Sequence, residues 1–360
     1  MPRILIAAVL LASLALPGQD SKDYIVAARR SGVIEFIDPA TLSTVGRIHL
    51  TLPQDSVGLN GVYLSADGSL LYIEGPLSDS PKMCCQLDSV DLRTLKTNRA
   101  AGIPGSPSRE AFLISDGLVY PTPALMARGI MRDLNGDQFY FSPDSQWLFG
   151  VRTFPGPEVD IVDVARAQIV RRLTSGNLKG EGWFPSGTWS AGRFYFYAEK
   201  TEGFAARLWP VQPDTTQLGD GISVEPHGQV QGCSSPRLEK ITASGGNLFL
   251  FELFGTKVDR RSQCHNRVPG GAWLLDPETG QLLRHVAPDL YLSTLIPDRT
   301  HTELYGLSIE DLIGICPVKL SRIDPRDGHV LQSRILDTDY WFMATAQLEN
   351  APTRDVLAVP

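Results

Sequence analysis

The sequence predicts an all-β fold of the β-propeller class, and three observations lead to this prediction. Two kinds of hairpin alternate along most of the chain, and most copies recur about 50 residues apart. One hairpin of each kind makes a unit of four strands, which is the repeat of a propeller blade. The chain also begins with the later strands of a unit and finishes with an unmatched hairpin of the other kind.

The outer hairpins consist of an apolar strand that ends in an aspartate, a turn and a second strand. An aspartate side chain can accept backbone N–H bonds in such a turn, while Pro presets φ and Gly supplies a positive φ. We therefore predict that these aspartates are structural and do not form a carboxylate site. They are Asp38, Asp91, Asp163, Asp276 and Asp324, in segments 33–50, 86–97, 159–173, 274–286 and 319–336.

The inner hairpins alternate apolar and polar residues into a turn and out again, which is typical of half-buried strands. The clear copies are 62–73, 139–151, 187–198, 241–252 and 293–308, with 341–359 as a related copy and 112–120 as a shorter one. If 112–120 opens a short blade, the propeller has seven blades, and if it is an insertion there are six. We favour seven.

The two ends of the chain predict how the propeller closes. Residues 23–39, "DYIVAARRSGVIEFIDP", read as later strands of a blade, and 341–359 read as a lone inner hairpin. Pairing the N-terminal with the C-terminal strands would complete one blade and remove the exposed edges of an open sheet.

The first 19 residues resemble a secretory signal peptide: Arg3 precedes an apolar run that ends in small and turn residues. We expect residues 20–360 to form a single propeller domain in the periplasm or outside the cell. The run is too short to span a bilayer, and no longer apolar run follows, so no membrane span is expected after cleavage. The net charge of −7 argues against nucleic acid as a partner.

The aspartate turns and the "SPDG"-like hairpins, clearest in 241–336, resemble the YVTN/cytochrome-D1-like (WD40-like) bacterial β-propellers. The heavy chain of methylamine dehydrogenase is an enzyme-associated relative in that group. In that enzyme a separate small chain carries the quinone cofactor. The resemblance therefore implies an exported propeller with a scaffold role and no cofactor of its own.

All five cysteines fall in connections that share one face of the predicted propeller: Cys84, Cys85, Cys233, Cys264 and Cys316. Cysteines in an oxidising compartment usually pair. We prefer a Cys233–Cys264 disulfide, which closes a loop of about 30 residues worth ~3 kcal/mol. Cys316 is an alternative partner for either, and Cys84–Cys85 is a possible vicinal bridge. The odd count leaves at least one thiol free or intermolecular.

The same face carries a basic segment, 257–268, "KVDRRSQCHNRV". Guanidinium groups bind carboxylates and phosphates bidentately, and a basic loop can also dock an acidic protein. A solvated loop is the plain alternative. The residues proposed for ligand or partner binding here are Arg260, Arg261, His265 and Arg267, with Arg237 and His227 on the preceding connection.

An aromatic segment, 182–200, is expected to fill the space between blades, with Trp183 as an alternative stacking platform for a sugar. The histidines show no metal-ligand spacing, so no metal is expected. Nucleophile-elbow, P-loop, Rossmann and haem-attachment motifs are absent from the sequence.

Two functions follow from these observations. The first is an exported, non-catalytic binding or scaffold module for an envelope protein or a small anionic or sugar-like ligand. The alternative is an enzyme, or the propeller subunit of one, such as an amine-dehydrogenase-like complex or a hydrolase or lyase. Its site would lie at the channel mouth.

Overall fold

The computed structural model describes most of the chain between Lys22 and Leu357, and the segment predicted as a signal peptide lies outside the described residues. The described residues are 22–50, 61–65, 70–74, 87–92, 94, 96–99, 112–115, 118–121, 138–153, 155–176, 178, 183–200, 205–224, 239–252, 270–298, 300, 302–309, 317–337, 340–348 and 355–357. No helix in these ranges is long and apolar enough to cross a membrane.

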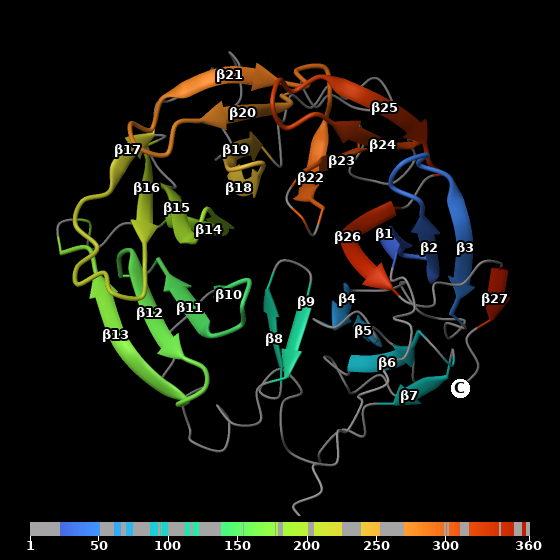
Figure 1. Cartoon of the computed structure of the whole chain (residues 1–360), viewed down its shortest axis with the longest axis horizontal. Helices are drawn as coiled ribbons and strands as arrows, with labels where there is room; N and C mark the ends of the chain where they lie inside the picture. The colour runs from blue at the N-terminus through green and yellow to red at the C-terminus, as the bar shows by residue number, and fades with distance from the viewer. Residues whose placement is uncertain are drawn as a thin grey trace, which may run out of the picture.

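The strands form sheets arranged around a common centre (Figure 1), and four of the sheets are four-stranded and antiparallel in chain order. The first two are β10 (Gln138–Phe141), β11 (Trp147–Arg152), β12 (Glu158–Asp163) and β13 (Gln168–Thr174), and β14 (Trp183–Ser190), β15 (Arg193–Lys200), β16 (Ala206–Val211) and β17 (Ile222–Val224). The next two are β18 (Glu239–Ser244), β19 (Asn247–Glu252), β20 (Ala272–Leu275) and β21 (Leu282–Val286), and β22 (Leu292–Pro297), β23 (Leu304–Ile309), β24 (Val318–Ile323) and β25 (Val330–Ile335).

Two further sheets each contain a four-stranded blade with additional strands. One has the order β26 (Tyr340–Leu348), β1 (Lys22–Arg29), β2 (Val33–Ile37), β3 (Thr44–His49) and β27 (Asp355–Leu357). The other contains β4 (Gly61–Ser65), β5 (Leu70–Glu74), β6 (Leu87–Asp91) and β7 (Thr97–Arg99), with β8 (Phe112–Ser115) and β9 (Leu118–Pro121) added beside β4. The protein is thus an all-β propeller with six blades of four antiparallel strands.

The structure does not support the seventh blade that we favoured from the sequence. Strands β8 and β9 do pair as the expected hairpin, but β9 joins an existing blade by parallel pairing with β4, from Leu64↔Leu118 to Ser65↔Val119. Figure 1 shows the hairpin between β4 and β10. The hairpin therefore extends the sheet of the blade β4–β7, in keeping with the insertion alternative.

Strands from the two ends of the chain share one blade, as the sequence predicts. β26 pairs antiparallel with β1 from Lys22↔Leu348 to Arg29↔Tyr340. The expectation of an inner hairpin over 341–359 was wrong, because β1 occupies the edge of β26 that the second arm would need. That second arm, β27, pairs in parallel with the outer strand β3 instead.

The turn role predicted for the five aspartates is confirmed. Asp38 Oδ1 accepts bonds from the backbone N–H groups of Ala40 and Thr41, each at 3.0 Å. The other aspartates accept corresponding bonds from backbone N–H groups: Asp91 from Thr94 (2.8 Å), Asp163 from Arg166 (2.9 Å), Asp276 from Glu278 (2.9 Å) and Asp324 from Arg326 (2.8 Å). One outer hairpin, β16–β17, was missed because its turn carries no such aspartate. There Gln212 N–H donates to Thr215 Oγ1 at 2.8 Å.

The aromatic segment fills the space between two blades, as expected. Trp189 and Phe194 are buried beside Phe149 from the preceding blade. The Phe149 ring centroid lies 5.0 Å from that of Trp189 and 4.8 Å from that of Phe194. Burial of aromatic rings is the largest single contribution that a side chain makes to a core. These rings therefore hold the blades β10–β13 and β14–β17 together.

Side chains of outer strands join several blades to the next blade's outer turn. Arg171 Nε donates to Pro213 O at 3.1 Å, and Gln332 Nε2 donates to Thr41 O at 2.8 Å. Arg284 makes the corresponding bond to Arg326 O. All three donors stand eight residues after the turn aspartate of their own hairpin, so a repeated sequence position makes a repeated inter-blade contact.

A buried glutamate organises the junction between β25 and the blade that contains both chain ends. Glu35 is 1% exposed. It accepts bonds from Arg47 Nε and Thr44 Oγ1, both at 2.8 Å, while Arg29 and Arg334 approach it at 3.7 and 3.9 Å. A buried carboxylate needs such partners, because desolvation of an unpaired charge is costly.

Candidate functional site

The binding residues predicted from the sequence lie outside the described part of the chain and stay predictions. They are Arg237, His227, Arg260, Arg261, His265 and Arg267, together with Cys84, Cys85, Cys233, Cys264 and Cys316. Trp183 begins β14, but its side chain is likewise outside the described part.

The described residues contain a cavity of about 250 Å³ where the blade β22–β25 meets the blade that joins the chain ends. The cavity is lined by Asp23, Tyr24, Ile25, Pro39, Ala40, Asp298, Thr300, Thr302, Glu303, Tyr305, Arg322 and Thr345. Strands β1, β23, β24 and β26 contribute to this lining together with two turns. The site consequently depends on elements from both ends of the chain.

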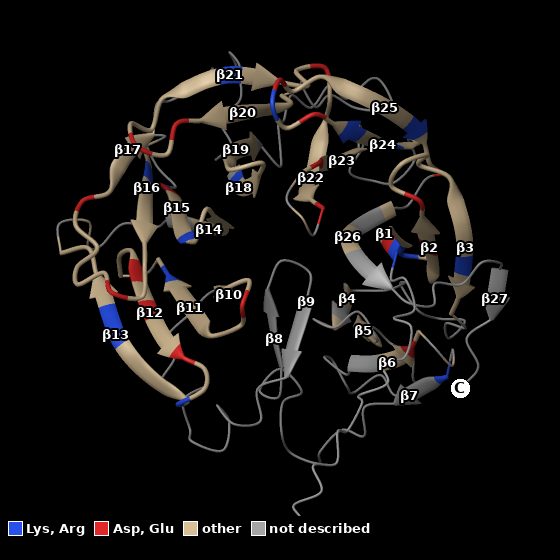
Figure 2. Cartoon of the chain, in the orientation of Figure 1, with Lys and Arg blue, Asp and Glu red and all other residues tan. Residues whose placement is uncertain are grey.

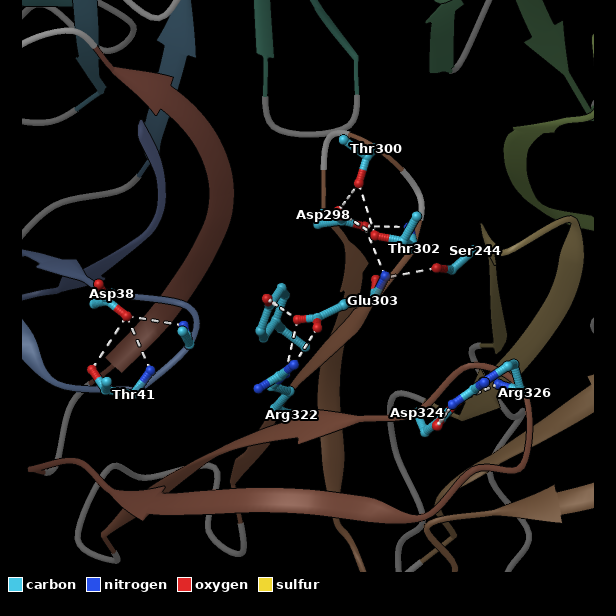
Figure 3. Close-up of polar contacts among 12 residues, drawn as sticks. Asp38, Thr41, Ser244, Asp298, Thr300, Thr302, Glu303, Arg322, Asp324 and Arg326 are labelled. Atoms are coloured by element: carbon cyan, nitrogen blue, oxygen red, sulfur yellow. Dashed lines mark hydrogen bonds and ion pairs between the residues drawn. The ribbon is translucent and has the colours of Figure 1, made fainter. Parts of the chain in front are cut away.

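One wall of the cavity is a three-residue polar network (Figure 3). Glu303 accepts a bond from Arg322 Nε at 2.8 Å and a second from another nitrogen of the same guanidinium. Tyr305 Oη donates to Glu303 at 2.6 Å. Bidentate pairing fixes the orientation of both partners, so this wall is held in place before any ligand enters.

The β22–β23 turn, which forms the rim of the cavity, is ordered by Asp298. Its Oδ1 accepts bonds from the backbone N–H groups of Thr302 at 2.6 Å and Glu303 at 2.8 Å, and its Oδ2 accepts one from Thr302 Oγ1 at 3.0 Å. The Thr300 hydroxyl also donates to Asp298. From the neighbouring blade, Ser244 Oγ donates to Glu303 O at 3.1 Å, so the turn is supported on two sides.

The opposite wall comes from β1, β26 and the β2–β3 turn. Thr345 Oγ1 donates to Pro297 O at 3.0 Å and so joins β26 to the end of β22. Asp23 contributes a carboxylate whose Oδ1 is buried and makes no hydrogen bond to the described residues. A buried polar atom of this kind calls for a partner, which in proteins is commonly water, an ion or a ligand.

Among the described residues of the lining, negative charges outnumber positive ones. Three carboxylates, those of Asp23, Asp298 and Glu303, lie with one guanidinium, that of Arg322. Lys22 lies nearby on β1, but it is an ion-pair partner of Asp38 at 2.5 Å. In the part of the chain that the structure describes, no group of acidic, His or Cys side chains could hold a metal ion. The excess of negative charge thus favours a ligand with positive charge or many hydrogen-bond donors.

The surroundings move the pKa values of three groups in the cavity, Tyr305, Asp298 and Arg322, away from pH 7. Burial, and then the bond to Glu303, raises the pKa of Tyr305 well above its ordinary range. Burial opposes ionisation of Asp298, but the bonds from Thr300 and from the turn N–H groups outweigh it and lower the pKa of that carboxyl. The bond to Glu303 raises the pKa of Arg322. Near pH 7, Tyr305 therefore stays neutral, Asp298 stays negative and Arg322 stays positive.

The cavity lies at the opposite ends of the strands from the connections that the sequence singled out. It is bounded by a first-to-second-strand turn, β22–β23, and a third-to-fourth-strand turn, β2–β3. The cysteines and the basic segment belong to second-to-third-strand connections and to the β17–β18 connection, which leave the described strands at the other end. Figure 2 shows acidic residues at the turn between β22 and β23.

The sequence analysis did not identify this site because Glu303 stands in the turn of a predicted hairpin, 293–308, where a polar residue is expected without any functional role. The network is nevertheless encoded in hairpin register. Tyr305 of β23 is the direct cross-strand partner of Arg322 in β24, and Glu303 ends the turn two residues earlier. Pairing the two predicted hairpins of this blade would have brought the three side chains together. The contribution of β1 and β26 depends on contacts across a blade junction, which a local pattern does not contain.

Comparisons with known proteins do not place the chain in a family. No family model matches it, and no curated protein matches it. Similar solved structures include dihydro-heme d1 dehydrogenase NirN in complex with DHE, with a TM-score of 0.49 and 11% identity over 91% of this chain and 75% of that one. Hydrazine synthase of Kuenenia stuttgartiensis gives a TM-score of 0.34 and 11% identity over 81% and 70%. At these scores the similarities carry no information on function.

Proposed function

We propose that the protein is a non-catalytic binding module that holds a small, positively charged ligand in the cavity between β22–β25 and the blade joining the chain ends. The observation that carries this proposal is the described part of the lining: three carboxylates, one guanidinium and three threonine hydroxyls around about 250 Å³. This size is somewhat below that of typical pockets for drug-sized molecules, so it suits a small ligand. A primary amine that also bears hydroxyl groups would meet both the charge and the hydroxyls.

The protonation states of three lining residues favour binding over catalysis at this site. A general acid or base works best with a pKa near the operating pH. The pKa values of Tyr305 and Arg322 are raised and that of Asp298 is lowered, each away from pH 7. The described residues of the lining also include no Ser, Cys or His that could serve as a nucleophile.

We further propose that the pairing of β26 with β1 closes the ring and thereby builds the cavity. Thr345 comes from β26 and Asp23 from β1, so opening this junction would separate two walls of the site. In keeping with the signal-like N-terminus, we place binding in the periplasm or outside the cell. An envelope protein docking on the basic segment 257–268 remains a separate proposal for the other face.

Thermal unfolding with three probes tests the charge preference. Ethanolamine serves as the cation, glucose as a neutral donor and acetate as the anion. We expect ethanolamine to raise the unfolding midpoint most, glucose less, and acetate not at all. A ligand at 100 times its Kd stabilises the folded state by ~2.7 kcal/mol.

A matched pair of variants locates the effect in the cavity. Asp23→Asn removes one lining charge, and Asp289→Asn makes the same change at an exposed position outside the lining. We expect Asp23→Asn to weaken ethanolamine binding about tenfold, the effect of 1.4 kcal/mol, and Asp289→Asn to leave it unchanged. Equal binding of acetate, or equal affinity in the two variants, would contradict the proposal.

A further inference from the structure

Independently of the cavity, the outer strand β25 presents an unusual edge. The described residues include five exposed large apolar side chains, and three of them lie on this one strand: Val330, Leu331 and Ile335. Ile335 is 72% exposed and Leu331 is 52% exposed. Within the described sheet, β25 pairs only with β24, so its other edge offers unpaired backbone groups at the outer rim (Figure 1).

Two of the other outer strands are protected in ways expected of sheet edges. β13 carries the exposed Arg172, and β3 is covered by β27. Charged side chains and covering segments are the usual means by which proteins block edge-to-edge pairing. The single charged residue of β25, Arg334, is turned toward the neighbouring blade, where it donates to Leu42 O at 2.7 Å. The edge of β25 therefore lacks this protection.

The exposed face of β25 is self-complementary. Successive side chains of a strand alternate between its faces, so Leu331, Ser333 and Ile335 point outward while Gln332 and Arg334 contact the next blade. An antiparallel copy centred on Ser333 would place Leu331 opposite Ile335 in both directions. A cation beside this face, Lys319, is the partner of Ile335 in β24. In this arrangement Lys319 of the second copy would lie about 13 Å along the strands from Lys319 of the first, because four residues at 3.3–3.4 Å each separate Leu331 from Ile335.

We propose that β25 pairs antiparallel with β25 of a second copy of this chain, forming a symmetric dimer through a continuous sheet. This pairing gives hydrogen-bond partners to the backbone groups on the open edge of β25, and it also covers Leu331 and Ile335. Such an interface is isologous, as is usual for dimers of identical chains. Its small size makes it a concentration-dependent dimer. The chain already shows that an outer edge accepts another strand, since β27 pairs with β3.

Sedimentation velocity over a range of concentrations tests this dimer with the full chain. We expect the weight-average mass to rise from that of one chain toward twice that value. Ile335→Lys, at a position exposed in the single chain, should keep the mass at one chain at every concentration. Leu283→Lys places the same charge on another exposed apolar position, on β21, and should leave dimer formation unchanged. Unchanged unfolding transitions would confirm that both variants fold.

A register-specific rescue separates this pairing from nonspecific association. Because Leu331 would meet Ile335 of the other copy, Leu331→Glu mixed with Ile335→Lys should form a mixed dimer, although neither variant associates alone. A chain that stays single at all concentrations would overturn the proposal. So would an Ile335→Lys variant that still dimerises, or a mixture that shows no rescue.

Discussion

At the scale of single residues, carboxylates have several structural roles in this protein, and their surroundings decide which role each one has. The turn aspartates accept backbone N–H bonds and have little to do with ligands. Glu35 neutralises converging arginines inside a blade junction. Glu303, in contrast, lines a cavity with a carboxylate excess. The aspartate turns were predictable because the bonds are local, within four residues. The roles of Glu35 and Glu303 depend on neighbours that the sequence places far away.

The carboxylates predict loss of stability in acid. Arg326 and the turn N–H lower the pKa of Asp324 to about 2. Burial opposes ionisation of Glu35, but Tyr340, Arg47 and Thr44 outweigh it and hold the pKa of that carboxyl below its ordinary value of 4.5. A carboxyl with a lowered folded-state pKa stabilises the fold above the unfolded-state pKa, and this contribution is lost as the pH falls. We expect the urea midpoint to fall steadily from pH 5 to pH 2.

Glu35→Gln provides the control for this pH dependence. The variant keeps the size of the side chain and removes its charge, so it should be less stable at pH 7 and lose less stability on acidification. Urea unfolding monitored by tryptophan fluorescence at several pH values measures both. A variant whose stability falls with pH as steeply as that of the unchanged protein would show that Glu35 does not contribute.

At the scale of strands and turns, blade junctions use repeated positions. Donors eight residues after the turn aspartate reach the next blade's turn at three junctions. The junction between β17 and the β20–β21 turn depends instead on close backbone approach. A Cβ added at Gly280, where φ is 74°, would lie 2.2 Å from Ser223 O. Strand positions could be predicted from the sequence because alternation is local, but this approach could not, since it joins two blades.

We therefore expect Gly280→Ala to destabilise the fold by more than the cost of placing an alanine at this positive φ. Gly246→Ala is the matched control, because φ there is 80° and an added Cβ would meet open space. A left-handed alanine costs ~1–2 kcal/mol, and we expect Gly280→Ala to cost a further 1–3 kcal/mol or so for overpacking. Denaturant unfolding of both variants measures the difference. Equal losses would mean that the β20–β21 turn moves away freely.

At the scale of the whole molecule, hairpin counting predicted the class of fold and the sharing of one blade between the chain ends. It failed where strand order departs from the repeat. β8–β9 joins an existing sheet instead of opening a seventh blade, and β27 crosses to an outer edge because β1 already pairs with β26. Both departures depend on which edges remain open after the other strands have paired. The cavity forms beside the blade that contains β26, β1 and β27, and local sequence patterns could not predict it either.

The most direct test of the central claim is hydrogen–deuterium exchange of the full chain with and without saturating ethanolamine. The account predicts slower exchange in peptides covering 22–25, 38–43 and 298–305, the walls of the cavity, with no change in β12 and β13. Protection confined to 227–237 and 257–268 would move the site to the basic face predicted from the sequence. That result, or no protection anywhere at saturation, would contradict a ligand site between these two blades.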